Sequence, residues 1–237
     1  MSEFVNTIDA QGDEETLNAL VSNTQTSYAD DKLTAICSYA FDHKTALTSI
    51  NLPNLTAIPA YGLSYCTGLT SLSLPAVTSI GNYAMQYCSG IQSLSFSEVV
   101  GTIGQYAFSN CTALETLNLP KATVLDTYAL QYCTKLTSLS IPLVTDLKNG
   151  AIFECWKLSS VSIPEVIYLR QYMFQSTLAG IVECPKVTTL GTYLGRYHGA
   201  PGFDFTQKVT IAANQFNSNY NLSTLVLRSS TMCTLSN

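Results

Sequence analysis

The stretch from Leu55 to Pro75, LTAIPAYGLSYCTGLTSLSLP, decides the fold because the chain repeats it. Close copies run from Val77 to Ser97, from Val100 to Pro120 and from Ala122 to Pro142. The copies share the pattern L-T-x-I-x-x-Y-A-F-x-x-C-x-x-L-x-S-L-x-L-P. Self-similarity at a fixed period is the signature of repeat architectures, so this repeat has to be interpreted before any other feature.

Three residue types keep the same period at three different positions of the repeat. Cysteines lie at 66, 88, 111, 133 and 155. Prolines lie at 53, 75, 120, 142, 164 and 185, with Ser97 in the one vacant position. Tyrosines lie at 39, 61, 83, 106, 128, 172 and 193, and Gly150 stands where one ring is missing. This agreement indicates a regular stack of coils.

Each repeat is predicted to form one coil of a solenoid. The segment LTSLSL alternates apolar and small polar residues, which places Leu72 and Leu74 inward and Ser71 and Ser73 outward on a strand. The strands are expected to stack into a parallel β-sheet on one face. The Y-A-F-x-x-C arm is expected to form the opposite wall, as short helical or irregular segments. About nine coils of roughly 22 residues follow from the first aliphatic anchors, which are Ile36, Ile58, Ile80, Ile103, Leu125, Leu147, Leu169, Leu190 and Ile211.

The two ends of the chain depart from the repeat. Residues 1–32 do not fit it, and DEETLNALV from Asp13 to Val21 has the acids and apolar spacing of a short capping helix. The solenoid is assigned to 33–231, with degenerate coils from about residue 186. No equivalent cap is evident at 232–237, so we expect a truncated end or one shielded by a partner, possible self-association included.

The motif I-G-x-Y-A-F-x-x-C followed by L-x-S-L-x-L-P resembles the BspA-like class of bacterial leucine-rich repeats. The resemblance covers 33–185 well and 186–231 loosely. It implies a leucine-rich-repeat solenoid in a secreted or surface-anchored, adhesin-type protein that binds host proteins, other bacteria or glycans. Comparable repeats also occur in prophage proteins of gut bacteria. The resemblance implies no catalytic residues.

Composition excludes several classes of partner. Charged residues make up only 11% of the chain, and the net charge is -5 at pH 7. The basic residues are scattered, so the basic stripe of a nucleic-acid-binding surface is missing. No apolar run approaches the roughly 20 residues that span a bilayer, and no signal-peptide plan is present. We expect no nucleic-acid partner and no membrane insertion. The resemblance implies an extracellular or cell-surface location, and removal of a signal sequence would leave the same N-terminus.

The sequence offers little chemistry for catalysis. Its eight cysteines include no C-x-x-C pair, which argues against a zinc site. The ladder cysteines and Cys184 are predicted to be buried free thiols, whereas Cys37 and Cys233 are the candidates for exposed thiols. The two histidines, His43 and His198, are interpreted as surface residues on a turn and in a loop. We therefore expect no enzyme activity, no metal and no cofactor.

Two surfaces are candidates for binding. The outward strand positions form a face of hydroxyl and amide groups, which either contacts a partner or is merely solvated. Its residues are Ser71, Ser73, Ser93, Ser95, Thr116, Asn118, Ser138, Ser140, Ser160 and Ser162. The degenerate eighth coil mixes aromatic and charged residues, as binding patches do, although decay of a terminal repeat gives the same pattern. Its candidate residues are Tyr193, Arg196, Tyr197, His198 and Asp204.

The tyrosine ladder has two interpretations. The rings either present a stripe that binds sugar or protein, or each packs against the ring of the next coil with its hydroxyl at the surface. The leading functional hypothesis is an adhesin-like recognition module that binds host protein or glycan through the solenoid surface. The alternative is a structural or receptor-binding component of a phage or prophage.

Overall fold

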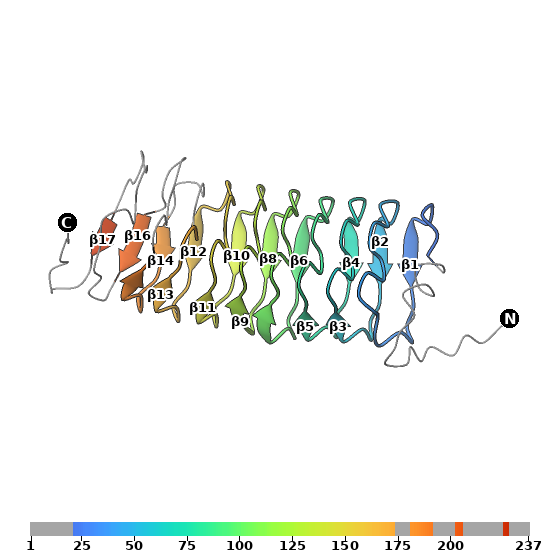
Figure 1. Ribbon diagram of the computed structural model, residues 1–237, viewed down its shortest axis with the longest axis horizontal. Coiled ribbons are helices and arrows are strands. Elements are labelled where there is room, and N and C mark those ends of the chain that lie inside the picture. The colour runs from blue at the N-terminus through green and yellow to red at the C-terminus, as the bar shows by residue number, and fades with distance from the viewer. Residues whose placement is uncertain (1–20, 174–180, 192–201, 206–224, 228–237) are drawn as a thin grey trace.

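The computed structural model describes residues 21–173, 181–191, 202–205 and 225–227. Within these residues the chain winds into an elongated solenoid of short parallel strands and turns, and no helix is present (Figure 1). Successive coils lie side by side along the long axis. The predicted capping helix and the ninth anchor, Ile211, lie outside the described residues, so the helical cap and the number nine stay predictions.

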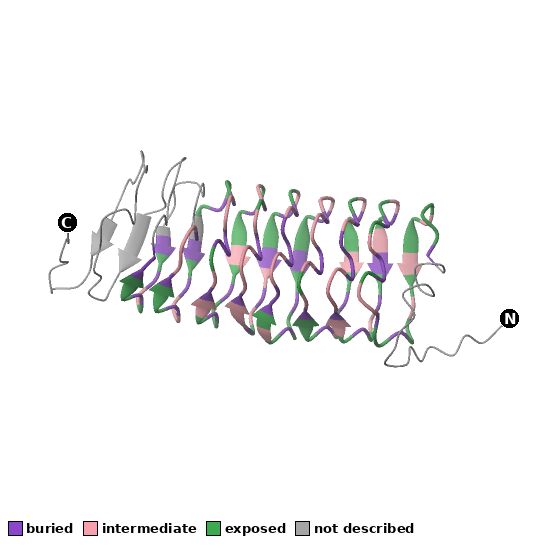
Figure 2. Cartoon of the chain, viewed as in Figure 1, coloured by how far each residue is buried: buried purple, intermediate pink, exposed green. Residues whose placement is uncertain are grey.

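One face of the solenoid carries the predicted parallel strands, which we call the strand face. Its strands are β1 (Ser27–Ala29), β2 (Ser49–Asn51), β4 (Ser71–Ser73), β6 (Ser93–Ser95), β8 (Thr116–Asn118), β10 (Ser138–Ser140), β12 (Ser160–Ser162), β14 (Ile181–Glu183), β16 (Gly202–Phe205) and β17 (Leu225–Leu227). They form three hydrogen-bonded sheets, β1-β2-β4, β6-β8-β10 and β12-β14-β16-β17. In β6 the middle residue, Leu94, is buried between two exposed serines, as the alternation predicts (Figure 2).

A second parallel sheet, which the sequence analysis did not predict, runs along an adjacent side that we call the flank. Its strands are β3 (Ala57–Ile58), β5 (Ser79–Ile80), β7 (Gly101–Ile103), β9 (Ala122–Leu125), β11 (Asp146–Leu147), β13 (Tyr168–Leu169) and β15 (Thr189–Leu190). Strands β3 to β11 pair in one sheet and β13 with β15 in another. The aliphatic anchors from Ile58 to Leu190 end these strands and are buried in the core, so each coil from β2 to β15 contributes two strands rather than one.

The third side of each coil, from Tyr61 to Cys66 in the clearest copy, is a stack of turns that we call the turn wall. Alternate backbone N–H groups donate to the next coil, as in Tyr61 to Asn82 (3.1 Å), Leu63 to Ala84 (2.8 Å) and Tyr65 to Gln86 (2.7 Å). The wall is thus irregular rather than helical, which settles the choice that the sequence had left open.

The left-handed backbone of the turn wall is unusual because tyrosine adopts it. The tyrosines at 39, 61, 65, 83, 87, 106, 128, 132 and 172 have φ between 54 and 62°. This conformation costs a non-glycine residue about 1–2 kcal/mol. Ring stacking between coils and the inter-coil N–H bonds offset that cost, since aromatic pairs contribute about 0.5–1.5 kcal/mol each.

The ladder cysteines lie inside the turn wall as free, fully buried thiols. Each donates its S–H to a backbone carbonyl of the preceding coil, as in Cys66 to Phe41 (3.1 Å) and Cys111 to Met85 (3.2 Å). Cys184 is buried as predicted, and Cys37 is half-buried. Cys233 lies outside the described residues. The thiols are therefore hydrogen-bonding parts of the stack as well as small apolar side chains.

Tyr83 offers a direct test of the balance between strain and stacking. Tyr83→Ala removes two stacked contacts and keeps a side chain at positive φ, so we expect the free energy of unfolding to fall by about 1–3 kcal/mol. Tyr83→Gly should cost less, because glycine adopts this φ without strain. Urea unfolding followed by circular dichroism measures both. A glycine variant less stable than the alanine variant would contradict this account.

The buried thiols make the stability of the fold depend on pH. Burial raises the pKa of Cys66 to about 12 and those of Cys88 and Cys111 well above their usual value. The unfolded thiols ionise near 8.5, so stability is fully present below that pH and is lost as pH rises toward the folded pKa. We expect the ladder thiols to react with Ellman's reagent at pH 8 only after denaturation. Rapid modification of Cys88 or Cys111 in the folded protein would refute this.

Candidate functional site

The strand face gathers the predicted hydroxyl and amide side chains in register. Ser93 pairs with Thr116, and their hydroxyls are hydrogen-bonded at 2.6 Å. Asn118 donates its amide N–H to Ser95 at 3.2 Å. All ten predicted positions lie on strands of this face, from Ser71 in β4 to Ser162 in β12. Binding by this face stays a prediction.

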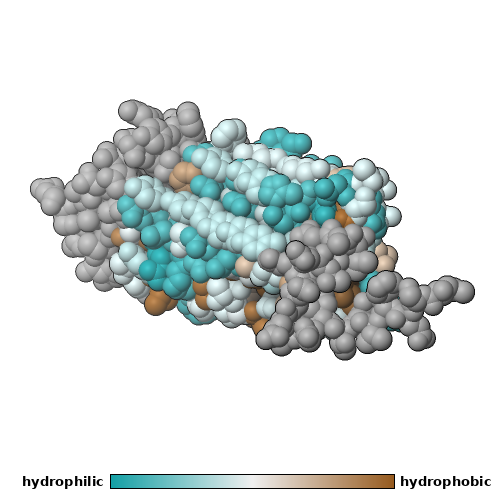
Figure 3. Space-filling model, turned by 45° about the vertical axis from the view of Figure 1, so that its right-hand side comes forward, coloured by the Kyte–Doolittle hydropathy of each residue, from teal (hydrophilic) through white to brown (hydrophobic). Residues whose placement is uncertain are grey.

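The turn wall carries two aromatic ladders. The first stacks Tyr39, Tyr61, Tyr83, Tyr106 and Tyr128, with ring centroids 4.6 to 5.3 Å apart and interplanar angles of 3 to 20°. Each ring thus packs against the next, which confirms the packing interpretation. The ring faces are covered inside the ladder, and the edges and hydroxyls remain for solvent. Pale bands of intermediate hydropathy run along the molecule in Figure 3.

The second aromatic ladder was missed by the sequence analysis. His43 stacks on Tyr65 and Tyr65 on Tyr87, each with centroids 4.4 Å apart. The Asp42 carboxylate is hydrogen-bonded to Nδ1 of the His43 ring at 2.8 Å. His43 is exposed, so it is the surface residue that the sequence predicted, and it also begins this ladder. The sequence contained a signal for this ladder, because each of these residues directly precedes the cysteine position of its repeat, as in Tyr65-Cys66 and Tyr87-Cys88.

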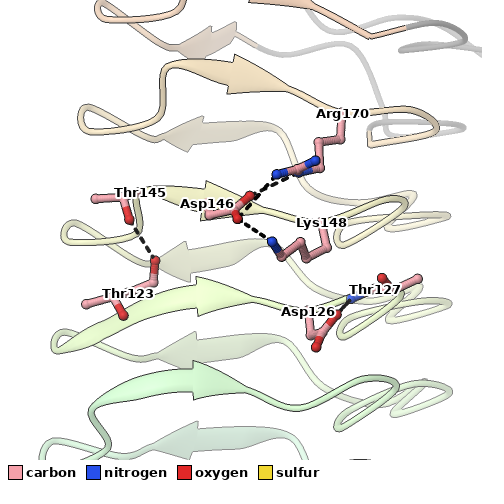
Figure 4. Close-up of polar contacts among 7 residues, drawn as sticks. All are labelled: Thr123, Asp126, Thr127, Thr145, Asp146, Lys148 and Arg170. Carbon is pink, nitrogen blue, oxygen red and sulfur yellow. Dashed lines mark hydrogen bonds and ion pairs between the residues drawn. The ribbon is translucent and has the colours of Figure 1, made fainter.

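The flank carries a charged cluster that breaks the repeat. Asp146 on β11 accepts hydrogen bonds from Arg170 (3.0 Å from Nε) and from Lys148 (2.5 Å), as Figure 4 shows. Burial alone would raise the pKa of Asp146, but these two hydrogen bonds outweigh it and hold the pKa below its ordinary value. The guanidinium of Arg170 also lies 5.3 Å from the centre of the Tyr168 ring. Asp146 thus orients Arg170 beside an aromatic ring.

A pocket of about 570 Å³ opens over this cluster, and we call it the flank pocket. It is lined by Thr145, Asp146, Glu165, Ile167, Tyr168 and Arg170. Ile167 is 60% exposed and Tyr168 37% exposed, although both are large hydrophobic residues. The neighbouring coils carry Thr123 and Thr145 where this coil has Ile167, and Thr145 donates to the Thr123 carbonyl at 3.3 Å (Figure 4). That substitution was the sequence signal for the pocket.

Most of the predicted patch in the degenerate coil lies beyond the described residues. This applies to Tyr193, Arg196, Tyr197 and His198. Asp204 lies on β16, where its backbone is in register with Glu183 of β14. The patch therefore remains a prediction.

Metal ligands and membrane spans were sought in the described residues. No group of three or more His, Cys, Asp or Glu side chains there is placed to hold a metal ion. The same part of the chain contains no helix with the length and apolar character needed to cross a bilayer.

Parallel strands on two sides, a wall of turns and an aliphatic core repeated from coil to coil define the chain as a leucine-rich-repeat β-solenoid. The sequence profile of the BspA type leucine rich repeat region matches it in six copies, over residues 21–135, 56–179 and 121–223. The chain belongs to this family, as its repeat motif implied. Comparison with curated proteins gave no match.

Solved structures of bacterial leucine-rich-repeat proteins resemble this fold. A leucine rich cell surface protein from Faecalibacterium prausnitzii A2-165 has a TM-score of 0.56 at 18% identity, covering 88% of this chain and 80% of its own. A leucine-rich repeat protein from Bacteroides ovatus ATCC 8483 has 0.45 at 14%, covering 87% and 84%. The T. pallidum leucine rich repeat protein has 0.46 at 21%, covering 76% and 73%. At 18% identity the first likeness concerns the fold alone.

Arg170→Met tests the flank cluster, because it removes the cation that contacts both Asp146 and Tyr168. We expect a loss of at most about 1 kcal/mol of unfolding free energy at pH 7, since the pair is partly exposed. Asp146 contributes stability above its unfolded pKa of about 3.9, and that contribution is lost as pH falls through its lower folded pKa. The difference between variant and wild type should therefore shrink in acid, as urea unfolding measures. An unchanged difference at low pH would count against the ion pair.

Proposed function

We propose that this protein is a non-enzymatic, adhesin-like recognition module, displayed at or outside the bacterial cell surface, that binds host protein or glycan through its solenoid surface. The flank pocket is the observation that carries the proposal. Tyrosine and arginine are among the residues that dominate binding energy at protein interfaces, and here Tyr168 and Arg170 line a pocket together with the exposed Ile167. Arg170 is held in place by Asp146, which lowers the entropy that it loses on binding.

The scaffold also supports a role in recognition. Repeat solenoids present long surfaces of fixed geometry, and partners bind along them. The strand face offers small hydroxyl and amide groups that permit close approach. The low charge of the chain, 11% of residues, favours contacts made by hydrogen bonds and apolar groups over electrostatic attraction.

The family and the related fold support the proposed location. The F. prausnitzii protein with this fold is described as a leucine rich cell surface protein. An extracellular site also agrees with a surface of uncharged hydroxyl and amide groups.

Binding of the labelled protein to host matrix proteins, mucin-type glycans and intact gut bacteria tests this function. Saturable binding to a host component is the expected result, and Tyr168→Ala should weaken it at least about tenfold, as expected for an aromatic anchor. Val100→Ala is the matched control, because Val100 is 55% exposed on the same side but does not line the pocket. Binding confined to particular bacterial strains would instead favour a phage or interbacterial role.

A further inference from the structure

Parallel ring stacking stops at the coil that carries Gly150. The second ladder already stops at Tyr87, because Asn110 stands at the next position. Tyr128, the last ring of the first ladder, and Tyr132 each meet Phe153 edge-on, with centroids 5.7 and 5.8 Å apart and interplanar angles of 86 and 88°. All stacked neighbours earlier in the ladders are nearly parallel. Phe153 therefore ends the first ladder and also packs against Tyr132.

Gly150 makes this ending possible. It occupies the ladder position of a tyrosine, has φ of +61° and is buried. A Cβ atom built on it would lie 2.3 Å from Cε1 of Tyr128, so the Tyr128 ring occupies the space that a side chain would need. Glycine is therefore required at position 150, because the Tyr128 ring fills the space that a ladder tyrosine would occupy there.

An exposed tryptophan lies on the same coil. Trp156 is 50% exposed, and its indole Nε1–H donates to the carboxylate of Glu154. Glu154 occupies the position that Tyr132 holds in the preceding coil and has φ of +58°. At the position of Trp156 the earlier coils carry only small hydroxyl residues, which are Thr45, Thr67, Ser89, Thr112 and Thr134. One large aromatic surface therefore stands at the end of a row of hydroxyls.

We propose that Trp156, with Glu154 and the exposed Tyr132 beside it, forms a carbohydrate-binding site at the end of the first ladder. A sugar ring combines an apolar C–H face with hydroxyls at its rim. The indole provides an aromatic surface for that face, and its orientation is fixed by Glu154. The Glu154 carboxylate has acceptor capacity beyond the indole N–H, and Thr134 and Tyr132 add hydroxyls.

The surroundings favour a sugar over a protein as the ligand. A protein interface needs an apolar core wider than one ring. Of the exposed large hydrophobic residues in the described part of the chain, Ile167 and Tyr168 belong to the flank and Val100 and Leu143 stand outside the turn wall. Tyr39 lies at the start of the first ladder, and among the exposed hydrophobic residues that the structure describes only Tyr132 lies on the turn wall near Trp156. An isolated aromatic ring among hydrogen-bonding groups matches a saccharide.

The regular part of the turn wall offers no comparable aromatic surface for a sugar ring. Inside the first ladder both faces of Tyr61, Tyr83 and Tyr106 are covered by neighbouring rings, so these faces are not accessible for stacking on a sugar. The ladder end is where parallel stacking stops and where an aromatic side chain outside the stack reaches solvent. This site extends the proposed function by naming a ligand class and the residues that bind it. Its biological role rests on that proposed function.

Trp156 is the only tryptophan in the chain, so tryptophan emission, excited at a wavelength that the tyrosines do not absorb, reports on this site alone. The protein is titrated with cellohexaose, with hexameric N-acetylglucosamine and with released mucin O-glycans. We expect a saturable change in emission and protection from acrylamide quenching with at least one of them. Calorimetry should then show about tenfold weaker binding for Trp156→Ala and near-native binding for Trp156→Tyr, which keeps an aromatic face.

Leu143→Ala is the control, because Leu143 is also 50% exposed but lies away from the ladder end. Circular dichroism establishes that each variant is folded. Unchanged emission with every saccharide, or equal affinity of Trp156→Ala and wild type, overturns the carbohydrate site. Loss of host binding in Tyr168→Ala but not in Trp156→Ala would support the proposed function and overturn a role for the Trp156 site in it. Loss of host binding in Trp156→Ala but not in Tyr168→Ala would support the Trp156 site and overturn a role for the flank pocket.

Discussion

Hydrogen bonding between equivalent residues of successive coils is the constraint on which the structure depends. Each coil must place its backbone N–H and C=O groups opposite those of its neighbours on the strand face, on the flank and in the turn wall. A coil that changed conformation would leave buried polar groups without partners on both sides. The conformation, left-handed residues included, is therefore copied from coil to coil even where it is costly. Side chains that recur at those positions, such as the stacked tyrosines and the hydrogen-bonded cysteines, offset that cost.

This constraint explains what the sequence could predict. Residues that serve the stack repeat at one period, so Leu74, Ser71 and Cys88 could be assigned to core, surface and turn wall from spacing alone. The flank sheet was missed because its strands are two to four residues long, and a segment such as Ala57–Ile58 is too short to show alternation. Positive φ at Tyr83 was also beyond prediction, since tyrosine has no intrinsic preference for that conformation and adopts it only within the stack.

The candidate sites could not be predicted in the same way, because they consist of departures from the repeat. Ile167 replaces a threonine and Trp156 replaces a small hydroxyl residue, and a single-residue change carries no periodic signal. Both positions are outward-facing, so the exchange removes the side-chain hydrogen bond that a threonine donates to the preceding coil, as Thr145 does, and leaves the core unchanged. A solenoid can accept large exposed side chains at such positions with little loss of stability, since surface substitutions away from special features cost little. The hydroxyl surface of the other coils then acts as a neutral background for these few groups.

The departures fall in neighbouring coils, and packing gives a reason for this. Stacking ties each ladder tyrosine to the rings before and after it, so a change within a ladder disturbs two contacts. Gly150 and Phe153 stop the parallel stacking of the first ladder at Tyr128, so the coil that carries them lacks that restriction. From this point the chain carries Trp156 on the turn wall and Tyr168 with Arg170 on the flank. The regular part of the solenoid thus provides rigidity, and the part beyond the ladder end is where the sequence is free to specify a ligand.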